Sequence, residues 1–212
     1  MYDKELILSR DYLAAEQGSY FTSWLGATAN TAVATTTQAL GTTSPSWVIY
    51  NGQPIGGKNL YIRFAKFEIT TATTGLTTVE HVGVLNSGSV HTTAGTLMAT
   101  PINVNGSSGE GSLSVLYGGV NVMATPAAAS RIVHAGTVDN TIPVVLDNWT
   151  LVYGEGATNM NKIGTMTLVK TISVAVSPVI VAPRQYYTLG FWGASWAASA
   201  PTYRMSVGWL EL

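Results

Sequence analysis

Short runs of β-branched and aromatic residues, separated by Gly, Asn, Pro and Ser, make up most of the sequence from residue 46 onwards. The runs lie at residues 46–50, 60–70, 78–85, 97–104, 113–117, 131–135, 143–153, 165–176, 186–192 and 203–210. Runs of this length, bounded by turn-forming residues, are typical of the strands of sandwiches and barrels. Patterns of helical length are absent from this part of the sequence. We therefore expect an all-β protein.

The last of these runs has the clearest period. Large apolar side chains alternate there with small or charged ones, so that one face of the run carries Tyr203, Met205, Val207 and Trp209. A period of two is expected of a strand that buries one face. In the run 60–70 the apolar positions change phase between Phe64 and Ala65. This change predicts a β-bulge, or a strand that changes sheet at that point.

The number and spacing of the runs favour one architecture. About eight to ten strands are predicted, with long excursions between some of them, and no internal repeat is evident. Long excursions favour a jelly-roll-like two-sheet β-sandwich over a meander of tight hairpins, and the lack of a repeat argues against solenoids and propellers. A length of 212 residues suits one such domain.

The beginning of the sequence differs in character from the remainder. Six charged residues fall within the first 17, although only 10% of the whole chain is charged. Apolar residues at near-helical spacing indicate a short helix, but an arm that orders on a partner fits equally well. We therefore predict an N-terminal arm or short helix at 1–26 and a single β-sandwich domain at 27–212. The candidate interface residues of the first segment are Tyr2, Leu6, Arg10 and Leu13.

The low charge also bears on the partners of the chain. Ordinary soluble domains carry about 25% charged residues, and the formal net charge here is −1. No basic surplus is present to neutralise phosphates, so nucleic acid is not expected as a partner. A net charge close to zero favours association. We expect the chain to pack against copies of itself or against another protein.

Membrane insertion and cysteine chemistry are not expected. The longest apolar-leaning stretch, 174–182, is interrupted by Ser177 and Pro178 and is shorter than the roughly 20 residues that span a bilayer. The sequence contains no cysteine, which excludes disulfides and Cys-based metal sites.

Catalytic signatures are also lacking. His81, His91 and His134 show no metal-binding spacing, and His81 alternates with Val79 and Gly83, which favours a structural or surface role. No Gly-x-Ser-x-Gly nucleophile motif occurs. Nothing pairs the carboxylates Glu68, Glu80, Glu110, Asp139, Asp147 and Glu155 as a glycosidase requires. We expect neither an enzyme, nor a metal, nor a cofactor; an enzyme acting on polysaccharide is the least favoured alternative.

The six tryptophans divide by context. Trp149, Trp192 and Trp209 lie in strand patterns, which favours packing in the core or between subunits. Trp196 lies in the loop 193–201 among small residues, so a partner subunit or a ligand is its expected neighbour. Trp196 is therefore a candidate interface residue, and with Tyr203 it forms the candidate glycan-stacking pair.

The C-terminal third carries a resemblance. An apolar run leads into a Tyr-rich strand, then a Trp-containing loop, then a final strand, in the order Val181-Ala182-Pro183-Arg184-Gln185, Tyr186-Tyr187-Thr188-Leu189 and Gly208-Trp209-Leu210-Glu211. This third resembles jelly-roll structural proteins of tailed-phage virions, a group that includes capsid cement or decoration proteins as well as tail, baseplate and fibre modules. The cement proteins are similar to this chain in being small and Cys-free, and they are often trimeric.

The resemblance implies a function. It points to a homotrimer on the capsid surface that binds the major capsid protein between capsomers, with the N-terminal segment gripping a neighbour. Burial of apolar surface, at about 25 cal/mol per Å², would then stabilise the shell. The alternative within the same resemblance is a receptor- or carbohydrate-binding module of a phage tail or fibre.

Overall fold

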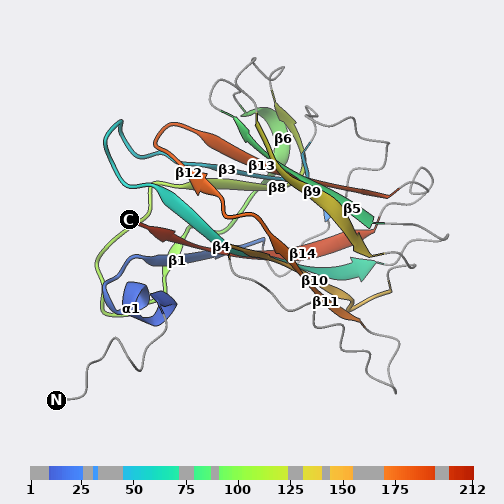
Figure 1. The fold of residues 1–212 in the computed structure, drawn as a ribbon, viewed down its shortest axis with the longest axis horizontal. Helices are drawn as coiled ribbons and strands as arrows, with labels where there is room; N and C mark the ends of the chain where they lie inside the picture. Colours follow the sequence, from blue (N-terminus) through green and yellow to red (C-terminus); the bar gives the residue numbers. More distant parts are fainter. Residues whose placement is uncertain are drawn as a thin grey trace.

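A computed structural model of the protein describes residues 10–25, 31–32, 45–71, 79–86, 91–123, 131–139, 144–154, 170–193 and 201–212. Within these residues the chain forms one short helix, α1 (Arg10–Glu16), and fourteen strands. Figure 1 shows the strands in two sheets that are packed face to face, with α1 at one end. The predicted all-β, two-sheet sandwich is confirmed.

We call the larger sheet A and the smaller sheet B. In order, sheet A contains β11 (Thr171–Val176), β10 (Asn148–Tyr153), β4 (Leu60–Thr71), β14 (Thr202–Glu211), β1 (Tyr20–Trp24) and β7 (Ile102–Asn103), with β12 (Ile180–Val181) paired to β4 and β2 (Thr31–Ala32) paired to β14. Sheet B contains β6 (His91–Leu97), β8 (Val115–Met123), β3 (Trp47–Tyr50), β13 (Tyr186–Gly193), β5 (Val79–Asn86) and β9 (Arg131–Asp139). All described pairs are antiparallel except β10 with β11.

Eight of the strands pair in a nested way. From the outermost pair inwards, β1 pairs with β14, β3 with β13, β4 with β10, and β5 with β9. Successive members of each half of this series alternate between sheet A and sheet B. A chain folded back on itself in this way and wrapped over two sheets is a jelly roll, as predicted. Strands β6, β7 and β8 lie in the connection between β5 and β9 and extend both sheets on the side of β1 and β3.

The core lies between the two sheets and is rich in aromatic side chains. On β14 the four residues predicted to share a buried face are all buried, which confirms the period of two. Trp149 and Trp209 are in the core as predicted, whereas the side chain of Trp192 lies outside the described residues. The largest fully buried side chains are Trp47, Trp149, Trp209, Tyr153, Tyr187, Tyr203, Phe21, Phe67, Phe191, Ile49 and Leu60.

The phase change on β4 is a bulge. Gly208 of β14 pairs with Phe64, whereas the next residue, Trp209, pairs with Ile62, so that Arg63 is the extra residue. The strand remains in sheet A on both sides of it. Of the two predicted alternatives, the bulge is therefore correct. As a result two successive side chains, Arg63 and Phe64, face away from the core, and the buried positions continue at Ala65.

The predicted domain boundary needs correction. Residues 1–9 lie outside the described residues, and α1 is the predicted short helix. Strand β1, which falls within the segment 1–26, is bonded between β14 and β7 and contributes Phe21 to the core. The sandwich therefore includes Tyr20–Trp24, which the sequence pattern placed in the N-terminal segment. The boundary was wrong because β1 is only five residues long and pairs with β14, at the other end of the sequence. Pairing between segments so far apart leaves no pattern in the sequence around β1.

Candidate functional site: the outer face of sheet A

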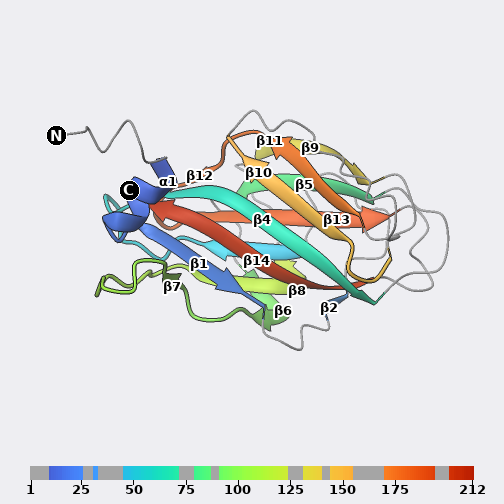
Figure 2. The ribbon, with the colours of Figure 1, turned by 90° about the horizontal axis from the view of Figure 1, so that it is seen from below.

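The outer face of sheet A carries the surface features most suited to binding. Along β1 the side chain of Phe21 faces the core, so Tyr20, Thr22 and Trp24 face outwards. The same alternation on β4, β10 and β14 allows the outward rows of side chains to be read directly from the strand register. These rows divide the face into an apolar half next to α1 and a polar half further along β1. Figure 2 shows α1 at one end of β1, β14 and β4.

The apolar half consists of two neighbouring rows. The row at the α1 end contains Ile180, Tyr61, Leu210, Tyr20 and Val104. The next row contains Val152, Phe64, Gly208, Thr22 and Ile102. Ile102, Val104 and Ile180 are each exposed over more than 40% of their surface. Exposed aliphatic side chains gathered on one face indicate a surface that another molecule covers.

Helix α1 is fixed to this half by an ion pair. Arg63, the bulge residue, contacts Asp11 of α1 through one edge of its guanidinium group. Nε lies 2.9 Å from Oδ1, and Nη2 donates to Oδ2 at 3.2 Å. A helix of seven residues is too short to be stable by itself. The bulge on β4 thus provides the anchor that places α1 on the sheet. Burial, and to a lesser degree the charge of Asp11, raise the pKa of Tyr20 beneath the helix.

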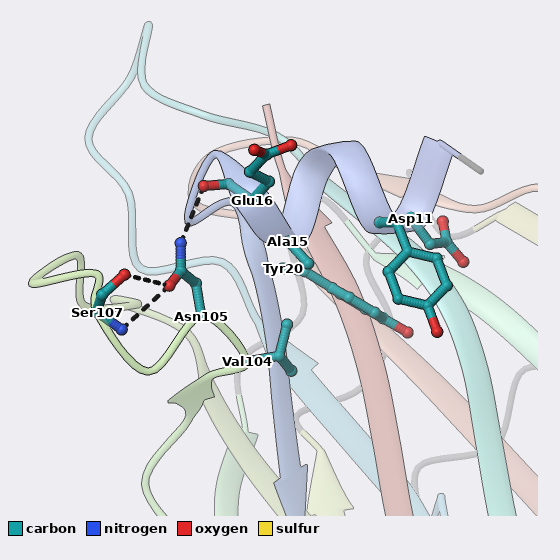
Figure 3. Close-up of a pocket in the computed structure, with 8 residues that line it drawn as sticks. Asp11, Ala15, Glu16, Tyr20, Val104, Asn105 and Ser107 are labelled. Atoms are coloured by element: carbon teal, nitrogen blue, oxygen red, sulfur yellow. Dashed lines mark hydrogen bonds between the residues drawn. The ribbon is translucent and has the colours of Figure 1, made fainter. Parts of the chain in front are cut away.

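A groove of about 840 Å³ lies between α1 and the segment that follows β7. Figure 3 shows Tyr20 beneath it, with the helix on one side and Val104 and Asn105 on the other. Asn105 Nδ2 donates to the Glu16 carbonyl oxygen at 2.9 Å, while its Oδ1 accepts from the backbone and hydroxyl of Ser107. The exposed ring of Tyr12 borders the groove. Its two walls are therefore fixed to each other, and its apolar side chains remain open to solvent.

The polar half also consists of two rows. Thr150, Lys66, Ser206 and Trp24 lie side by side across β10, β4, β14 and β1, and Asn148, Glu68 and Arg204 form the next row. A hollow of about 340 Å³ lies here, lined by Trp24, Leu25, Lys66, Glu68, Arg204, Met205 and Ser206. Arg204 Nη1 is 3.6 Å from Glu68 Oε1. An exposed indole thus lies beside hydroxyl groups and charges of both signs.

The structure places the predicted site residues as follows. Tyr2, Leu6 and Trp196 lie outside the described residues, Arg10 is the first residue of α1, and Leu13 is half-buried in the same helix. Tyr203 was expected to stack on a glycan, and this expectation is wrong. Its side chain is 0% exposed, and its hydroxyl donates to the Ser46 carbonyl oxygen at 2.9 Å inside the sandwich. Its position on the buried face of β14, which the alternation had already indicated, excludes contact with a ligand.

Sequence reasoning missed a contact between two histidines. His81 of β5 and His134 of β9 face each other in the core, with ring centroids 5.2 Å apart. His134 Nε2 contacts the hydroxyl of Tyr187, which contacts that of Tyr153. Burial lowers the pKa of His81 to about 4, and burial together with the charge of His81 lowers that of His134 to about 3. The sequence between them gave no sign of this contact, because only the β5–β9 register creates it.

One buried carboxylate also escaped the sequence reasoning. Glu211, 1% exposed at the end of β14, accepts hydrogen bonds from the hydroxyl groups of Ser112 and Ser114, from the Trp209 indole and from the Gln53 amide. Four donors occupy its oxygens, so its role is structural. Among the described residues no three His, Asp or Glu side chains are grouped so as to hold a metal ion. No helix in this part of the chain is long and apolar enough to cross a membrane.

Comparisons with the models of protein families, with curated proteins and with solved structures found no match to this chain.

Proposed function

We propose that this chain is a structural protein of a tailed-phage virion, a capsid cement protein that binds between capsomers through the apolar half of sheet A. The observation that carries the proposal is the group of exposed apolar side chains beside α1, formed by Tyr12, Ile102, Val104 and Ile180. In this arrangement the major capsid protein covers these side chains, and the chain acts as a homotrimer.

Three further observations support this function. The jelly roll is an architecture found in viral capsid proteins, although the fold alone does not decide function. A charged fraction of 10% and a net charge of −1 favour association with other proteins. The groove beside α1 has fixed walls, since Arg63 anchors the helix and Asn105 ties the helix end to the segment after β7. A preformed groove lowers the entropic cost of binding.

The test uses purified particles that carry the chain. We expect mass spectrometry to find hundreds of copies per particle, and we expect particles stripped of the protein to release their genome at lower temperature. Adding back the wild-type protein should restore heat resistance. A few copies at a vertex or tail, or unchanged heat resistance after stripping, would contradict the proposal.

A matched pair of variants tests whether the apolar half of sheet A is the docking surface. Ile102 and Ile132 are both strand isoleucines, 48% and 49% exposed, but Ile132 lies on β9 of sheet B. Ile102→Thr should rebind stripped particles at least tenfold more weakly than wild type, while Ile132→Thr should rebind normally. Equal rebinding by both variants would show that the apolar half is not the docking surface.

A further inference from the structure

Trp24 differs from the other tryptophans whose side chains the structure describes. Four tryptophan side chains are described, and three of them, Trp47, Trp149 and Trp209, are buried in the core. Trp24 is 41% exposed at the end of β1, on the outer face of sheet A. An exposed indole offers a flat apolar surface whose N–H can still reach a polar partner, which is why tryptophan is common where apolar and polar surfaces meet.

The neighbours of Trp24 form a row of polar groups. Thr150, Lys66 and Ser206 lie in register with it across four adjacent strands. Three steps between strands, each about 4.8 Å, give this row a length of about 14 Å. The hollow of about 340 Å³ beside it falls within the range of small-molecule sites, roughly 300–1,000 Å³. The row thus suits an extended, hydroxyl-rich ligand with one apolar face.

The charges of the residues that line the hollow favour an anionic ligand over a neutral one. Lys66 and Arg204 line it together with one carboxylate, Glu68, so that its lining has a net positive charge in a chain of net charge −1. Glu68 holds Arg204 at 3.6 Å, a separation too long for a hydrogen bond, and Arg204 remains about half exposed. Its N–H groups therefore remain accessible to an anionic group of a ligand.

From this arrangement we infer a saccharide site: the polar half of sheet A binds an acidic oligosaccharide, one sugar ring stacking on Trp24 and a uronate carboxylate facing Lys66 and Arg204. A pyranose ring has an apolar C–H face that an indole covers, and its hydroxyl groups match Ser206 and Thr150. This site is separate from the apolar half, so either proposal can fail without the other.

A single-stranded nucleic acid would also stack on an indole. Its binding depends, however, on several cations that follow the phosphates. Among the described residues the hollow is lined by two cations, Lys66 and Arg204, which is too few to follow several phosphates. The saccharide is therefore the better match.

The experiment is a calorimetric titration of the full chain with tetramers of galacturonate, mannuronate and guluronate, and with neutral maltotetraose. We expect at least one uronate tetramer to bind at least tenfold more tightly than maltotetraose. Trp24→Ala should weaken that binding at least tenfold, and Lys66→Ala should weaken it severalfold while removing part of its salt dependence. Ile102→Thr, in the apolar half, should bind the tetramer as the wild type does.

A second measurement uses the wild-type protein alone, so its result does not depend on whether the variants fold. In a ¹⁵N-labelled sample, the bound uronate should shift the indole N–H resonance of Trp24 and leave those of Trp47, Trp149 and Trp209 in place. Failure of every uronate to bind, equal binding of maltotetraose, an unmoved Trp24 resonance, or tighter binding of an eight-residue oligothymidylate would each overturn the inference.

Discussion

Nε2 of His134 lies 2.6 Å from the hydroxyl oxygen of Tyr187, in a part of the core where Gly83 provides the space for both groups. A Cβ atom on Gly83 would overlap the His134 imidazole and would lie 2.6 Å from the Tyr187 hydroxyl. The absence of a side chain at residue 83 is therefore a condition for this hydrogen bond.

Gly83→Ala should for this reason destabilise the sandwich by about 1–3 kcal/mol, as overpacking of a core does. Urea unfolding monitored by tryptophan fluorescence measures the change. Gly106→Ala is the control, because a Cβ atom at residue 106 would have no other atom within 4 Å of it; it should leave stability unchanged or raise it by about 0.4–1 kcal/mol. Equal midpoints for the two variants would contradict the packing argument.

The buried histidines predict a loss of stability in acid. Both are neutral when folded, with pKa values of about 4 and about 3, whereas an unfolded histidine has a pKa of about 6.5. Above pH 6.5 both histidines are neutral in the folded and in the unfolded protein, and the stability is at its full value. As the pH falls below 6.5 the unfolded protein binds protons that the folded protein does not, so the free energy of unfolding declines. This decline ends once the pH has passed through the folded pKa values. Each histidine adds about 1.4 kcal/mol per pH unit to the slope within this window.

This pH dependence can be measured by urea unfolding at pH 7.5, 6.0 and 5.0. His81→Phe, which replaces the imidazole with a ring suited to its neighbour Phe191, should reduce the slope by about 1.4 kcal/mol per pH unit. A slope identical to that of the wild type would show that His81 is not buried as a neutral group.

Tyr203→Phe distinguishes a structural tyrosine from a ligand-binding one. Its hydroxyl donates to the Ser46 carbonyl oxygen and accepts from the Gly119 N–H at 3.3 Å. Removing it leaves buried backbone groups with fewer partners, so we expect a loss of about 1–3 kcal/mol in stability. Binding of the uronate tetramers should not change at 25 °C, where the variant stays folded. Weaker saccharide binding at full stability would argue against its structural role.

The anchor of α1 can be weakened without unfolding the sandwich. In the Arg63→Lys variant, the single ammonium group cannot form the bidentate contact with Asp11. Because the pair is partly exposed, we expect a global effect of only about 0.2–1 kcal/mol. Amide hydrogen exchange should accelerate in residues 10–16 while remaining unchanged in β14. Lys58→Met, which removes a more exposed contact with Glu110, should alter neither region.

Glu211→Gln tests whether the carboxylate at the end of β14 is required. An amide NH₂ in place of one carboxylate oxygen would point donor hydrogens at one or more of the donors Ser112, Ser114, Trp209 and Gln53. Stability should fall by about 1–3 kcal/mol, because buried donors lose their acceptor. A thermal melt no different from the wild type would contradict this assignment.

Much of the fold could be predicted from local patterns. The period of two in β14 identified its buried face, and the phase change in β4 identified the bulge to within one residue. Both patterns are properties of a strand and its own side chains. The number of strands and the long connections between them then pointed to the jelly roll, whose topology the structure confirms.

The features that sequence reasoning missed depend on contacts between distant residues. Strand β6, of sequence HTTAGTL, has no large apolar side chain before Leu97 and is held by its pairing with β8. Trp24 was one of six tryptophans, with no local sign of exposure. Only the register of β1, β14 and β4 shows that it lies near Lys66 and Arg204 rather than in the core. The candidate site is formed by residues from several strands, so no single segment of the sequence reveals it.

The nested pairing has a consequence for the synthesis of this protein. Strand β14 lies between β4 and β1 in the centre of sheet A, yet it is the last described strand to leave the ribosome. Until it arrives, β1 and β4 each have an edge with unpaired backbone groups, which is a site for association with other chains. We expect the nascent chain to remain a client of chaperones until β14 has emerged and has paired with both β1 and β4.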